Sequence, residues 1–313
     1  MRLKDKVAVL YGGESDESEV SHITADAVIA AMDELSIDYE KIELTGEWII
    51  KLKLLKPDFA FLALHGSPGE DGTVQAVLDS LKIAYNGSGV LASALVMDKS
   101  RSKKIARLSG LDVANEAVFK EFSKPKLEMI ESIGLSLPVV VKPVNGGSSL
   151  GVSIVTTPEQ WEDALKHVEG YGSFMVEEYI PGMELTVGML GDTPLAVTEI
   201  IANEAGFYDY DSKYKDGGSE HIIPANLDDA EYKALMDDAV KVVNAFGCTG
   251  VSRVDFRYDP ATKRRVLLEA NTLPGLTSTS LVPEQAAYKG MNFNLLIMWM
   301  MEDVKWQKQV KAV

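Results

Sequence analysis

Two short segments in the C-terminal third of the chain combine a buried-strand pattern with oxygen-bearing side chains. Arg265 to Leu268 has the apolar character of a buried strand, and Glu269 and Asn271 follow two residues apart. Side chains at that spacing leave the same side of an extended chain. Arg253 and Asp255 repeat the spacing in a β-rich run upstream. Two carboxylates and one amide oxygen can therefore converge, and Mg²⁺ prefers such hard ligands together with substrate phosphates.

The alternative interpretation of these residues is a hairpin with solvent-facing charges, and for either strand alone the two interpretations are equally good. Glycine and hydroxyl residues follow the second strand directly, within Thr272 to Ser280. Because such residues suit a ligand-binding turn, we predict a metal-nucleotide site.

Composition limits the classes of ligand and compartment. The chain has 313 residues, enough for roughly two domains, and a formal net charge of -16 that argues against nucleic-acid binding. A phosphate ligand would need a local basic pocket. Cys248 is the only cysteine, which excludes a disulfide framework, and the longest apolar run, Leu295 to Met301, is too short to span a bilayer. We expect a soluble cytoplasmic protein without membrane insertion.

The N-terminal segment has the pattern of a doubly wound α/β sheet. Val7 to Tyr11 reads as a buried strand, a glycine pair follows, and Glu19 to Leu35 has helical periodicity. Ligands of such sheets lie beyond the carboxyl ends of the strands. The full Gly-x-Gly-x-x-Gly fingerprint is missing, so a nicotinamide cofactor is disfavoured.

Two polar residues lie at these predicted strand ends. Glu17 precedes the first helix, where it either complements the helix dipole or holds a ligand's ammonium group. His65 ends the predicted strand Phe59 to Leu64 and begins a tight His-Gly-x-x-Gly-Glu-Asp-Gly loop. We place the first domain boundary near Met97.

A lysine and a glycine-rich loop indicate phosphate binding in the middle of the chain. The predicted strand Pro138 to Lys142 delivers Lys142 into the loop Asn145 to Gly151, whose backbone N-H groups can approach phosphate oxygens. The helix Asp98 to Leu108 carries Lys99, Lys103 and Lys104 at helical spacing, a pattern that most often marks a solvated face.

Three further segments complete the pattern. The strand Phe174 to Ile180 contains Glu177 and Glu178, acids that can accept hydrogen bonds from an adenine amine or from ribose. Asn203 to His221 has no clear period and several tyrosines, which favours a lid over a disordered tip. The helix Asp229 to Phe246 is amphipathic, and the helix Met291 to Val304 is apolar enough for the core or a subunit contact.

Seven motifs in order make the chain resemble the ATP-grasp ligases and, within them, the D-alanine:D-alanine ligase family. The resemblance runs from Val7 to Pro283. The motifs are Gly12-Gly-x-x-x-Glu17-x-Glu-Val-Ser21, Leu64-His65-Gly66, Gly87-Ser-Gly-Val-x-Ala-Ser-Ala-Leu-x-Met-Asp-Lys99, Val141-Lys142-Pro143 with Gly147-Ser-Ser-x-Gly151, Tyr208-Asp-Tyr-x-x-Lys213-Tyr214, Arg253-x-Asp255, and Leu268-Glu-Ala-Asn271-Thr-x-Pro-Gly-x-Thr-Ser-x-Ser-Leu281.

The resemblance implies an α/β ATP-grasp fold and an ATP-dependent ligase. An N-terminal doubly wound, substrate-binding domain (1–97) would precede two α+β lobes that sandwich ATP: a central lid domain (98–182) and a C-terminal catalytic domain (183–313) with a lid loop at 203–222. One D-alanine carboxylate would attack the γ-phosphorus of ATP, and a second D-alanine amine would attack the acylphosphate. The dipeptide would serve peptidoglycan synthesis, and a homodimer is common in the family.

The resemblance also implies residue roles. Two Mg²⁺ ions, or Mn²⁺ in their place, would be bound by Asp255, Glu269 and Asn271. ATP would be held by Lys99, Lys142, Gly147, Ser148, Ser149, Glu177, Glu178, Tyr179, Ile180, Glu184, Tyr208 and Lys213. The catalytic residues would be Glu17, Ser148, Tyr214, Arg253 and Gly275, with Arg253 and the Gly275 N-H facing the oxyanion. The substrates would be bound by Glu17, His65, Ser280 and Leu281.

Two alternatives remain at the level of sequence. One is a ligase with another second substrate, such as D-serine or D-lactate; in the family a tyrosine at Tyr214 accompanies an amine acceptor, so we expect a dipeptide. The other is a nucleotide-binding relative without catalysis, against which the intact Arg253, Asp255, Glu269 and Asn271 argue.

Overall fold

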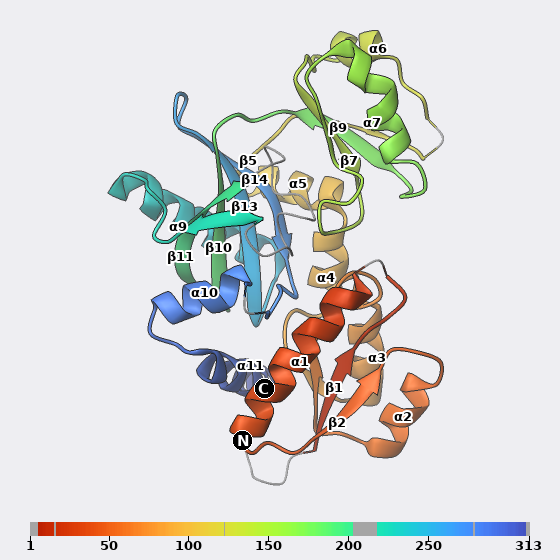
Figure 1. The fold of residues 1–313 in the computed structure, drawn as a ribbon, viewed down its shortest axis with the longest axis vertical. Helices are drawn as coiled ribbons and strands as arrows, with labels where there is room; N and C mark the ends of the chain where they lie inside the picture. Colours follow the sequence, from red (N-terminus) through yellow and green to blue (C-terminus); the bar gives the residue numbers. More distant parts are fainter. Residues whose placement is uncertain (1–5, 16, 122, 203–217, 278, 311–313) are drawn as a thin grey trace.

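The chain forms three sheets, each with its own covering of helices (Figure 1). The structure, a computed structural model, describes residues 6–15, 17–121, 123–202, 218–277 and 279–310, with side chains described up to residue 303. Tyr208, Lys213, Tyr214 and most of the expected lid loop lie outside the described residues. Residues 219–222 of that expected loop form a strand instead.

The N-terminal sheet is parallel and has the order β2-β1-β3-β4. Alternate residues of β1 face opposite sides: Val7 and Val9 pack on one core, and Ala8 and Leu10 on another. This two-sided burial confirms the expected doubly wound sheet. Its elements are β1 (Val7–Tyr11), α1 (Ser18–Glu34), β2 (Tyr39–Glu43), α2 (Trp48–Leu55), β3 (Phe59–Leu62), α3 (Thr73–Leu81) and β4 (Ala84–Tyr85).

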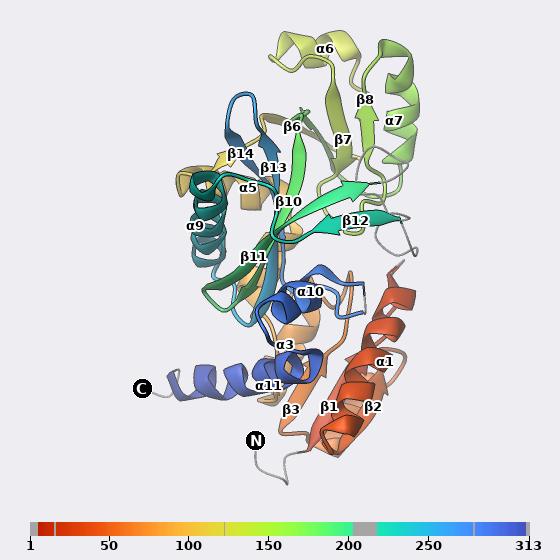
Figure 2. The same ribbon diagram turned by 60° about the vertical axis from the view of Figure 1, so that its left-hand side comes forward.

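The last helix of the chain packs against this first sheet. Leu296, Ile297 and Met300 of α11 (Phe293–Val310) share a core with Val9 of β1 and Val28 of α1. Figure 2 shows α11, the last helix of the chain, beside the N-terminal sheet. The apolar face of this helix is therefore core within the monomer, the first of the two interpretations drawn from its composition.

The middle of the chain forms a small antiparallel sheet with the order β6-β9-β7-β8. Trp161 and Leu165 of α7 and Ile130 of α6 are buried with Val139 and Val141 of β7. The elements are β6 (Glu116–Phe119), α6 (Leu127–Ser132), β7 (Val139–Pro143), β8 (Ser153–Val155), the 3-10 turn Pro158–Gln160, α7 (Trp161–His167) and β9 (Phe174–Glu178). The other face of this sheet is left to face the third sheet.

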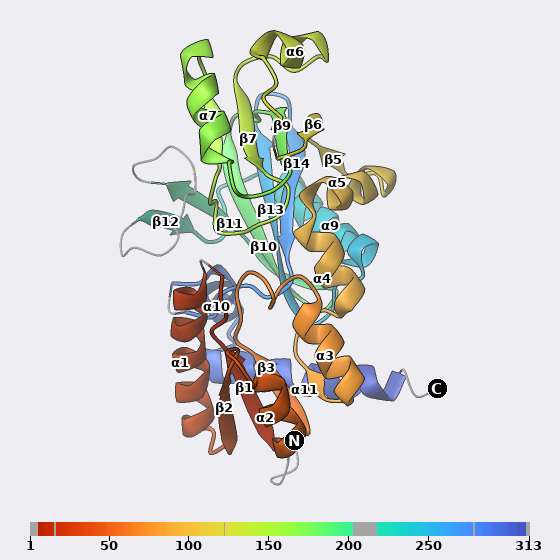
Figure 3. The same cartoon turned by 90° about the vertical axis from the view of Figure 1, so that its right-hand side faces the viewer.

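The third sheet contains the two acidic segments. Its order is β12-β11-β10-β13-β14-β5, with all pairs antiparallel except β14 with β5. Helices α5 and α9 pack together and cover one face, and Figure 3 shows α3, α4 and α5 following one another from the first sheet to the third. The elements are α4 (Val90–Met97), α5 (Lys99–Leu108), β5 (Asp112–Val113), β10 (Met183–Leu190), β11 (Thr193–Ala202), β12 (Ser219–Ile222), α9 (Asp229–Phe246), β13 (Val251–Asp259), β14 (Arg264–Asn271) and α10 (Leu281–Tyr288).

The long periodic segments were predicted well and the strand ends less so. The helix Asp229–Phe246 has the predicted bounds, whereas β14 runs on to Asn271, so that Glu269 and Asn271 lie within the strand and not after it. In the part of the chain that the structure describes, no helix is long and apolar enough to cross a membrane.

Candidate active site

Asp255 and Glu269 face each other across the antiparallel pair β13 and β14. Asp255 accepts hydrogen bonds from Thr186 Oγ1 at 2.6 Å and from Asn271 Nδ2 at 3.0 Å, and Arg253 Nη2 lies 2.8 Å from its Oδ2. Lys99 Nζ lies 3.1 Å from Glu269 Oε2. The two-residue spacing in the sequence thus brings two carboxylates and an amide together, as predicted.

The donor set fits a hard divalent cation that also binds a substrate. Among the described residues, no three His, Cys, Asp or Glu side chains form a cluster that could hold a metal by themselves. Asp255 and Glu269 offer two carboxylates on the wall of a pocket that Lys99 and Lys142 also line. Mg²⁺ commonly takes one or two carboxylates and completes its shell with water and phosphates, so this incomplete cage suits it.

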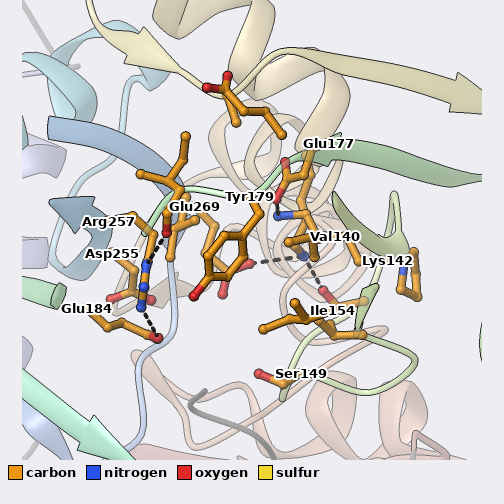
Figure 4. Close-up of a pocket in the computed structure, with 18 of the residues that line it drawn as sticks. Val140, Lys142, Ser149, Ile154, Glu177, Tyr179, Glu184, Asp255, Arg257 and Glu269 are labelled. Carbon is orange, nitrogen blue, oxygen red and sulfur yellow. Dashed lines mark hydrogen bonds and ion pairs between the residues drawn. The ribbon is translucent and has the colours of Figure 1, made fainter. Parts of the chain in front are cut away.

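That pocket, here called the interlobe pocket, lies between the second and third sheets. Figure 4 shows Asp255, Glu269, Arg257 and Glu184 on one side and Lys142, Glu177, Val140 and Ile154 on the other, with Tyr179 between them. Its remaining lining includes Ala114, Gly147, Ser149, Leu150, Val152, Glu178, Ile180 and Leu268. An apolar slot between two sheets with charged groups at one end matches a flat base attached to phosphates.

Glu177 stands between two lysines. Its Oε1 lies 2.5 Å from Lys142 Nζ and its Oε2 lies 2.5 Å from Lys103 Nζ, which also contacts Glu116 at 2.9 Å. Burial alone would raise the pKa of the Glu177 carboxyl, but Lys142 and Lys103 outweigh it and lower the pKa to about 2. Glu177 is therefore ionised, and the buried pairs fix Lys142 at the pocket wall.

The segment between β9 and β10 is held by Arg257. Arg257 Nε donates to the Ile180 carbonyl at 3.1 Å, Nη2 donates to the Gly182 carbonyl at 2.8 Å, and the guanidinium lies 6.0 Å from the Tyr179 ring centroid. Arg257 Nη1 also lies 3.5 Å from Glu184 Oε2. One side chain thus positions the backbone and side chains that line this end of the pocket.

The side chain of Glu178 is bound elsewhere. Arg264 Nη1 lies 2.7 Å from its Oε1, and Asn115 donates to its Oε2 at 3.3 Å. The carboxylate is thus engaged by Arg264 and Asn115, which is consistent with the expected contact through the Glu178 backbone.

A second pocket, here called the Glu17 pocket, lies where the N-terminal sheet meets the third sheet. It is lined by Glu17, His65, Glu70, Gly147, Ser148, Arg253, Asn271, Leu273, Pro274, Gly275, Thr279, Ser280 and Leu281. Ser148 Oγ donates to Glu17 Oε1, which joins the glycine-rich loop to the end of the first sheet. Gly66, at φ +67°, is close to the same carboxylate: a Cβ there would lie 2.7 Å from Glu17 Oε2, so only glycine fits.

His65 is a buried, neutral member of this pocket. Its Nε2 lies 2.9 Å from Thr24 Oγ1. Burial and, secondarily, the charge of Arg253 lower the pKa of His65 to about 4. The imidazole therefore contributes no charge near neutral pH.

Ser280 shapes the opposite end of the Glu17 pocket. It precedes α10, and its Oγ accepts from the Thr277 N-H at 2.9 Å. A Cβ on Gly275 would lie 2.8 Å from this Oγ. The first N-H groups of α10, beginning at Leu281, have no partner within the helix, which makes this end of the pocket a suitable place for a carboxylate.

Comparisons with known proteins agree with this geometry. A family profile described as "D-ala D-ala ligase C-terminus" matches residues 106–302, and one described as "D-ala D-ala ligase N-terminus" matches residues 50–88. The chain is 44% identical over 303 residues to the D-alanine–D-alanine ligase of Gluconobacter oxydans, covering 95% of this chain and 98% of the relative. This chain belongs to the D-alanine–D-alanine ligase family.

Other members of the family are also similar along nearly their whole length. The D-alanine–D-alanine ligase of Chelativorans sp. is 46% identical over 306 residues, covering 96% of this chain and 98% of the relative. A crystal structure of the Bacillus anthracis D-alanine–D-alanine ligase complexed with ATP has a TM-score of 0.84 at 29% identity, covering 98% and 99% of the two chains. The predicted ATP-grasp fold is confirmed by this match.

One similar structure is that of a ligase named for a different acceptor. The VanG D-Ala:D-Ser ligase from Enterococcus faecalis has a TM-score of 0.81 at 32% identity, covering 95% of this chain and 98% of that one. The architecture of this ligase family therefore occurs with more than one acceptor.

The predicted site residues that the structure describes line the two pockets, whereas Tyr208, Lys213 and Tyr214 lie outside the described residues. The interlobe pocket is lined by Lys99, Lys142, Gly147, Ser149, Glu177, Glu178, Tyr179, Ile180, Glu184, Asp255 and Glu269. The Glu17 pocket is lined by Glu17, His65, Ser148, Arg253, Asn271, Gly275, Ser280 and Leu281. Ser148, which was assigned both to ATP binding and to catalysis, lines the Glu17 pocket, and Gly147 lines both pockets.

Sequence reasoning missed three charged residues near these pockets. Arg257 continues the two-residue spacing of Arg253 and Asp255, and that alternation could have shown it. Lys103 was interpreted as part of a solvated face, yet it is 1% exposed because α5 packs its face against Glu116 and Glu177. Glu70 lies in the loop after His65 and lines the Glu17 pocket. The only sequence feature that could have indicated it is the presence of several acidic residues near the end of a predicted strand.

Proposed function

We propose that this ligase joins two D-alanine molecules into D-alanyl-D-alanine while ATP is cleaved to ADP and phosphate, and that the dipeptide serves peptidoglycan synthesis. The observation that carries the proposal is the junction of the two pockets. Gly147 lines both, and the strand pair β13 and β14 contributes Asp255 and Glu269 to one pocket and Arg253 and Asn271 to the other. A phosphate group and an amino acid carboxylate can therefore meet there.

ATP would occupy the interlobe pocket with its base in the slot beside Tyr179 and Ile180. Glu177 and the backbone of Glu178 and Ile180 would accept or donate the hydrogen bonds of the adenine edge, and Glu184 would bind ribose. Lys99 and Lys142 would hold phosphate oxygens, which is how a chain of net charge -16 provides a local cationic site. The structure of the B. anthracis relative is complexed with ATP, which supports ATP as the nucleotide of this chain.

Asp255, Glu269 and Asn271 would hold two Mg²⁺ ions, with Mn²⁺ as an alternative. When bound, such ions withdraw charge from the phosphates during a transfer that depends mostly on positioning. The chain's own contribution is to fix Asp255 through Thr186 and Arg253 and to keep Lys99 beside Glu269.

The first D-alanine would bind with its ammonium group at Glu17 and its carboxylate toward the interlobe pocket. That carboxylate attacks the γ-phosphorus, the bond from phosphorus to the bridging oxygen breaks, and ADP leaves. Ser148 holds Glu17 in place, and His65, neutral and bonded to Thr24, lies at the wall of the same pocket.

The second D-alanine would bind with its carboxylate at Ser280 and the Leu281 N-H, at the start of α10. Its amine attacks the acylphosphate carbon, and Arg253 and the Gly275 N-H would face the oxyanion of the tetrahedral intermediate. Loss of one such donor typically costs on the order of 10²- to 10³-fold in rate. We also propose a cytoplasmic location and a homodimer, on the strength of the family alone.

The test is ADP release by the purified protein with Mg-ATP and D-alanine, L-alanine, D-serine or D-lactate, each alone and each of the last three paired with D-alanine, with mass analysis of the products. We expect D-alanyl-D-alanine from D-alanine and little turnover with D-lactate. Turnover that needs D-alanine and D-serine together would instead identify D-serine as the acceptor, as in the name of the E. faecalis relative. Nucleotide binding without turnover on any of the four would contradict a ligase of this specificity.

A further inference from the structure

Gln285 is a fully buried amide in α10, one turn after Leu281. Both ends of the amide are hydrogen-bonded to the third sheet. The Gly188 N-H donates to Gln285 Oε1 at 2.6 Å. Gln285 Nε2 donates to the Thr186 carbonyl at 3.3 Å and to Thr198 Oγ1 at 3.0 Å. A buried polar group that is satisfied in this way holds one geometry, and none of the roles assigned above uses it.

The bond to Gly188 lies at an interruption in the pairing of β10 with β11. The register of the two strands shifts between Val187 and Met189, and the Gly188 N-H at this shift donates to the side chain of Gln285. The absence of a side chain at Gly188 also allows the helix to come close. A Cβ there would lie 2.8 Å from Gln285 Oε1 and 3.4 Å from Val282 Cγ2. The helix α10 therefore docks at a defined place on β10.

The two β10 residues bonded to Gln285 are the cross-strand partners of two candidate active-site residues. Gly188 is paired with Arg253 on β13, and Thr186 is paired with Asp255. Thr186 Oγ1 also donates to Asp255 Oδ1 at 2.6 Å. Gln285 thus connects α10 to the proposed oxyanion residue and to a proposed metal ligand, in each case across a single strand.

Apolar contacts alone would not fix the position of α10 along the sheet. The helix packs on β10 and β11 (Figure 2), where Val282 and Ala286 share a core with Leu195. Burial of apolar surface is non-directional, so it favours contact without selecting one register. Hydrogen bonds have narrow ranges of distance and angle. Those of Gln285 therefore select one position for the helix.

We propose that Gln285 is a positioning residue for the second amino acid. It holds the start of α10, where Ser280 and the Leu281 N-H would bind the acceptor carboxylate. The acceptor amine is then in register with Arg253 and Asp255, at the acyl carbon. This inference rests on the proposed function and adds the residue that sets its acceptor site. The effect is large for a remote side chain, because misplacement of a bound group by about 1 Å can cost about 10²-fold in rate.

The test is a separate Michaelis constant for each amino acid site, obtained from initial rates of ADP release over a wide range of D-alanine concentrations at saturating Mg-ATP. Gln285→Met keeps the length of the side chain and removes its hydrogen bonds. We expect the constant of the second site to rise by about tenfold or more. The constants of the first site and of ATP should change by less than about threefold, because neither Glu17 nor any residue that lines the interlobe pocket belongs to α10.

A second variant disturbs the same contact by crowding. Gly188→Ala places a methyl group against Gln285 Oε1 and Val282, which displaces α10 without removing the amide. The constant of the second site should again rise alone. This variant decides the question if Gln285→Met melts early.

Thr198→Val is the matched control. It removes one partner of Gln285 Nε2, also at a fully buried position, and leaves both bonds from Gln285 to β10. We expect a lower melting temperature, with all three Michaelis constants within about threefold of the wild type, as for changes that leave the bound substrates in place.

Each outcome is decisive. A rise confined to the second site in Gln285→Met or Gly188→Ala, and absent from Thr198→Val, supports the proposal. Constants that stay unchanged in both variants, that all rise together, or that rise equally in Thr198→Val overturn it while the proposed function stands. If the wild type forms no dipeptide from D-alanine and ATP, the proposed function fails, and the role of Gln285 fails with it.

Discussion

Ser148 and Glu17 are 131 residues apart in the chain, and Ser148 Oγ donates a hydrogen bond to Glu17 Oε1. The bond connects the loop after β7 with the start of α1, and so connects the second sheet with the first. Gly147, the residue before Ser148, lines both pockets. Closure of the glycine-rich loop over a nucleotide and orientation of the Glu17 carboxylate are therefore mechanically linked.

Removing this hydrogen bond should weaken binding of the first amino acid. In Ser148→Ala, Glu17 loses a neutral donor to a charged group, a contact usually worth about 1.5 to 3 kcal/mol. We expect the KM for D-alanine at the first site to rise by about tenfold or more, with a smaller change in the KM for ATP. Steady-state kinetics at varied D-alanine would check this. The control is Ser153→Ala in β8, the strand beside β7, which removes a hydroxyl bonded to His167 of α7. Equal effects of the two substitutions would contradict the assignment.

A methyl group at Gly147 should have a related effect by crowding. Its Cβ would lie 3.0 Å from Glu17 Oε2 and 3.1 Å from Oε1. We expect Gly147→Ala to displace the carboxylate and to raise the KM for D-alanine, with little loss of thermal stability. Gly89→Ala serves as the control, because its Cβ would lie 3.9 Å from Tyr85 Oη, an ordinary contact. Unaltered kinetics in Gly147→Ala would show that Glu17 does not need its present position.

Lys103 should be essential for stability and also for nucleotide affinity. Lys103→Met leaves Glu177 and Glu116 buried without one of their cations, and breaking a buried pair costs about 3 to 5 kcal/mol. Urea denaturation should show this loss, and the KM for ATP should rise because Glu177 and Lys142 are no longer fixed. Lys104→Met, on the exposed side of the same helix, should do neither. Adding Glu116→Gln to Lys103→Met should restore part of the stability; no restoration would contradict the pairing as its source.

The low pKa of His65 predicts a loss of stability in mild acid. Its pKa is about 4 in the folded protein and about 6.5 in an unfolded chain. As the pH falls below 6.5, the unfolded state binds the proton first, so the free energy of unfolding decreases until about pH 4. The loss is at most about 3 kcal/mol. Urea denaturation at several pH values would measure it. In His65→Gln this part of the pH dependence should disappear, and an identical slope in both proteins would contradict it.

Spacing along single strands predicted the core of the site. Glu269 with Asn271 and Arg253 with Asp255 lie on one face of their strands, and this follows from chain geometry alone. Lys142, delivered by β7 into the glycine-rich loop, was equally visible. The C-terminal end of β14 could not be predicted. Its pairing with β13 extends the strand through polar residues whose sequence is typical of a turn.

Burial by distant segments could not be predicted in the same way. Lys103 and Lys104 are adjacent lysines on one helix, and only the packing of α5 beside β6 and β9 makes the first buried and the second exposed. The position of α11 beside β1 is a similar case, since it joins the two ends of the chain. Such contacts depend on the tertiary arrangement, which a local pattern does not contain.

The transfer of oxygen from substrate to phosphate tests the central claim most directly. D-alanine labelled with ¹⁸O in its carboxylate is incubated with Mg-ATP and the protein, and the released phosphate is analysed by mass. If the carboxylate of the first D-alanine attacks the γ-phosphorus, one labelled oxygen appears in the phosphate for each dipeptide formed. Unlabelled phosphate accompanied by dipeptide would contradict the acylphosphate and the arrangement of the two pockets around Gly147 proposed to produce it.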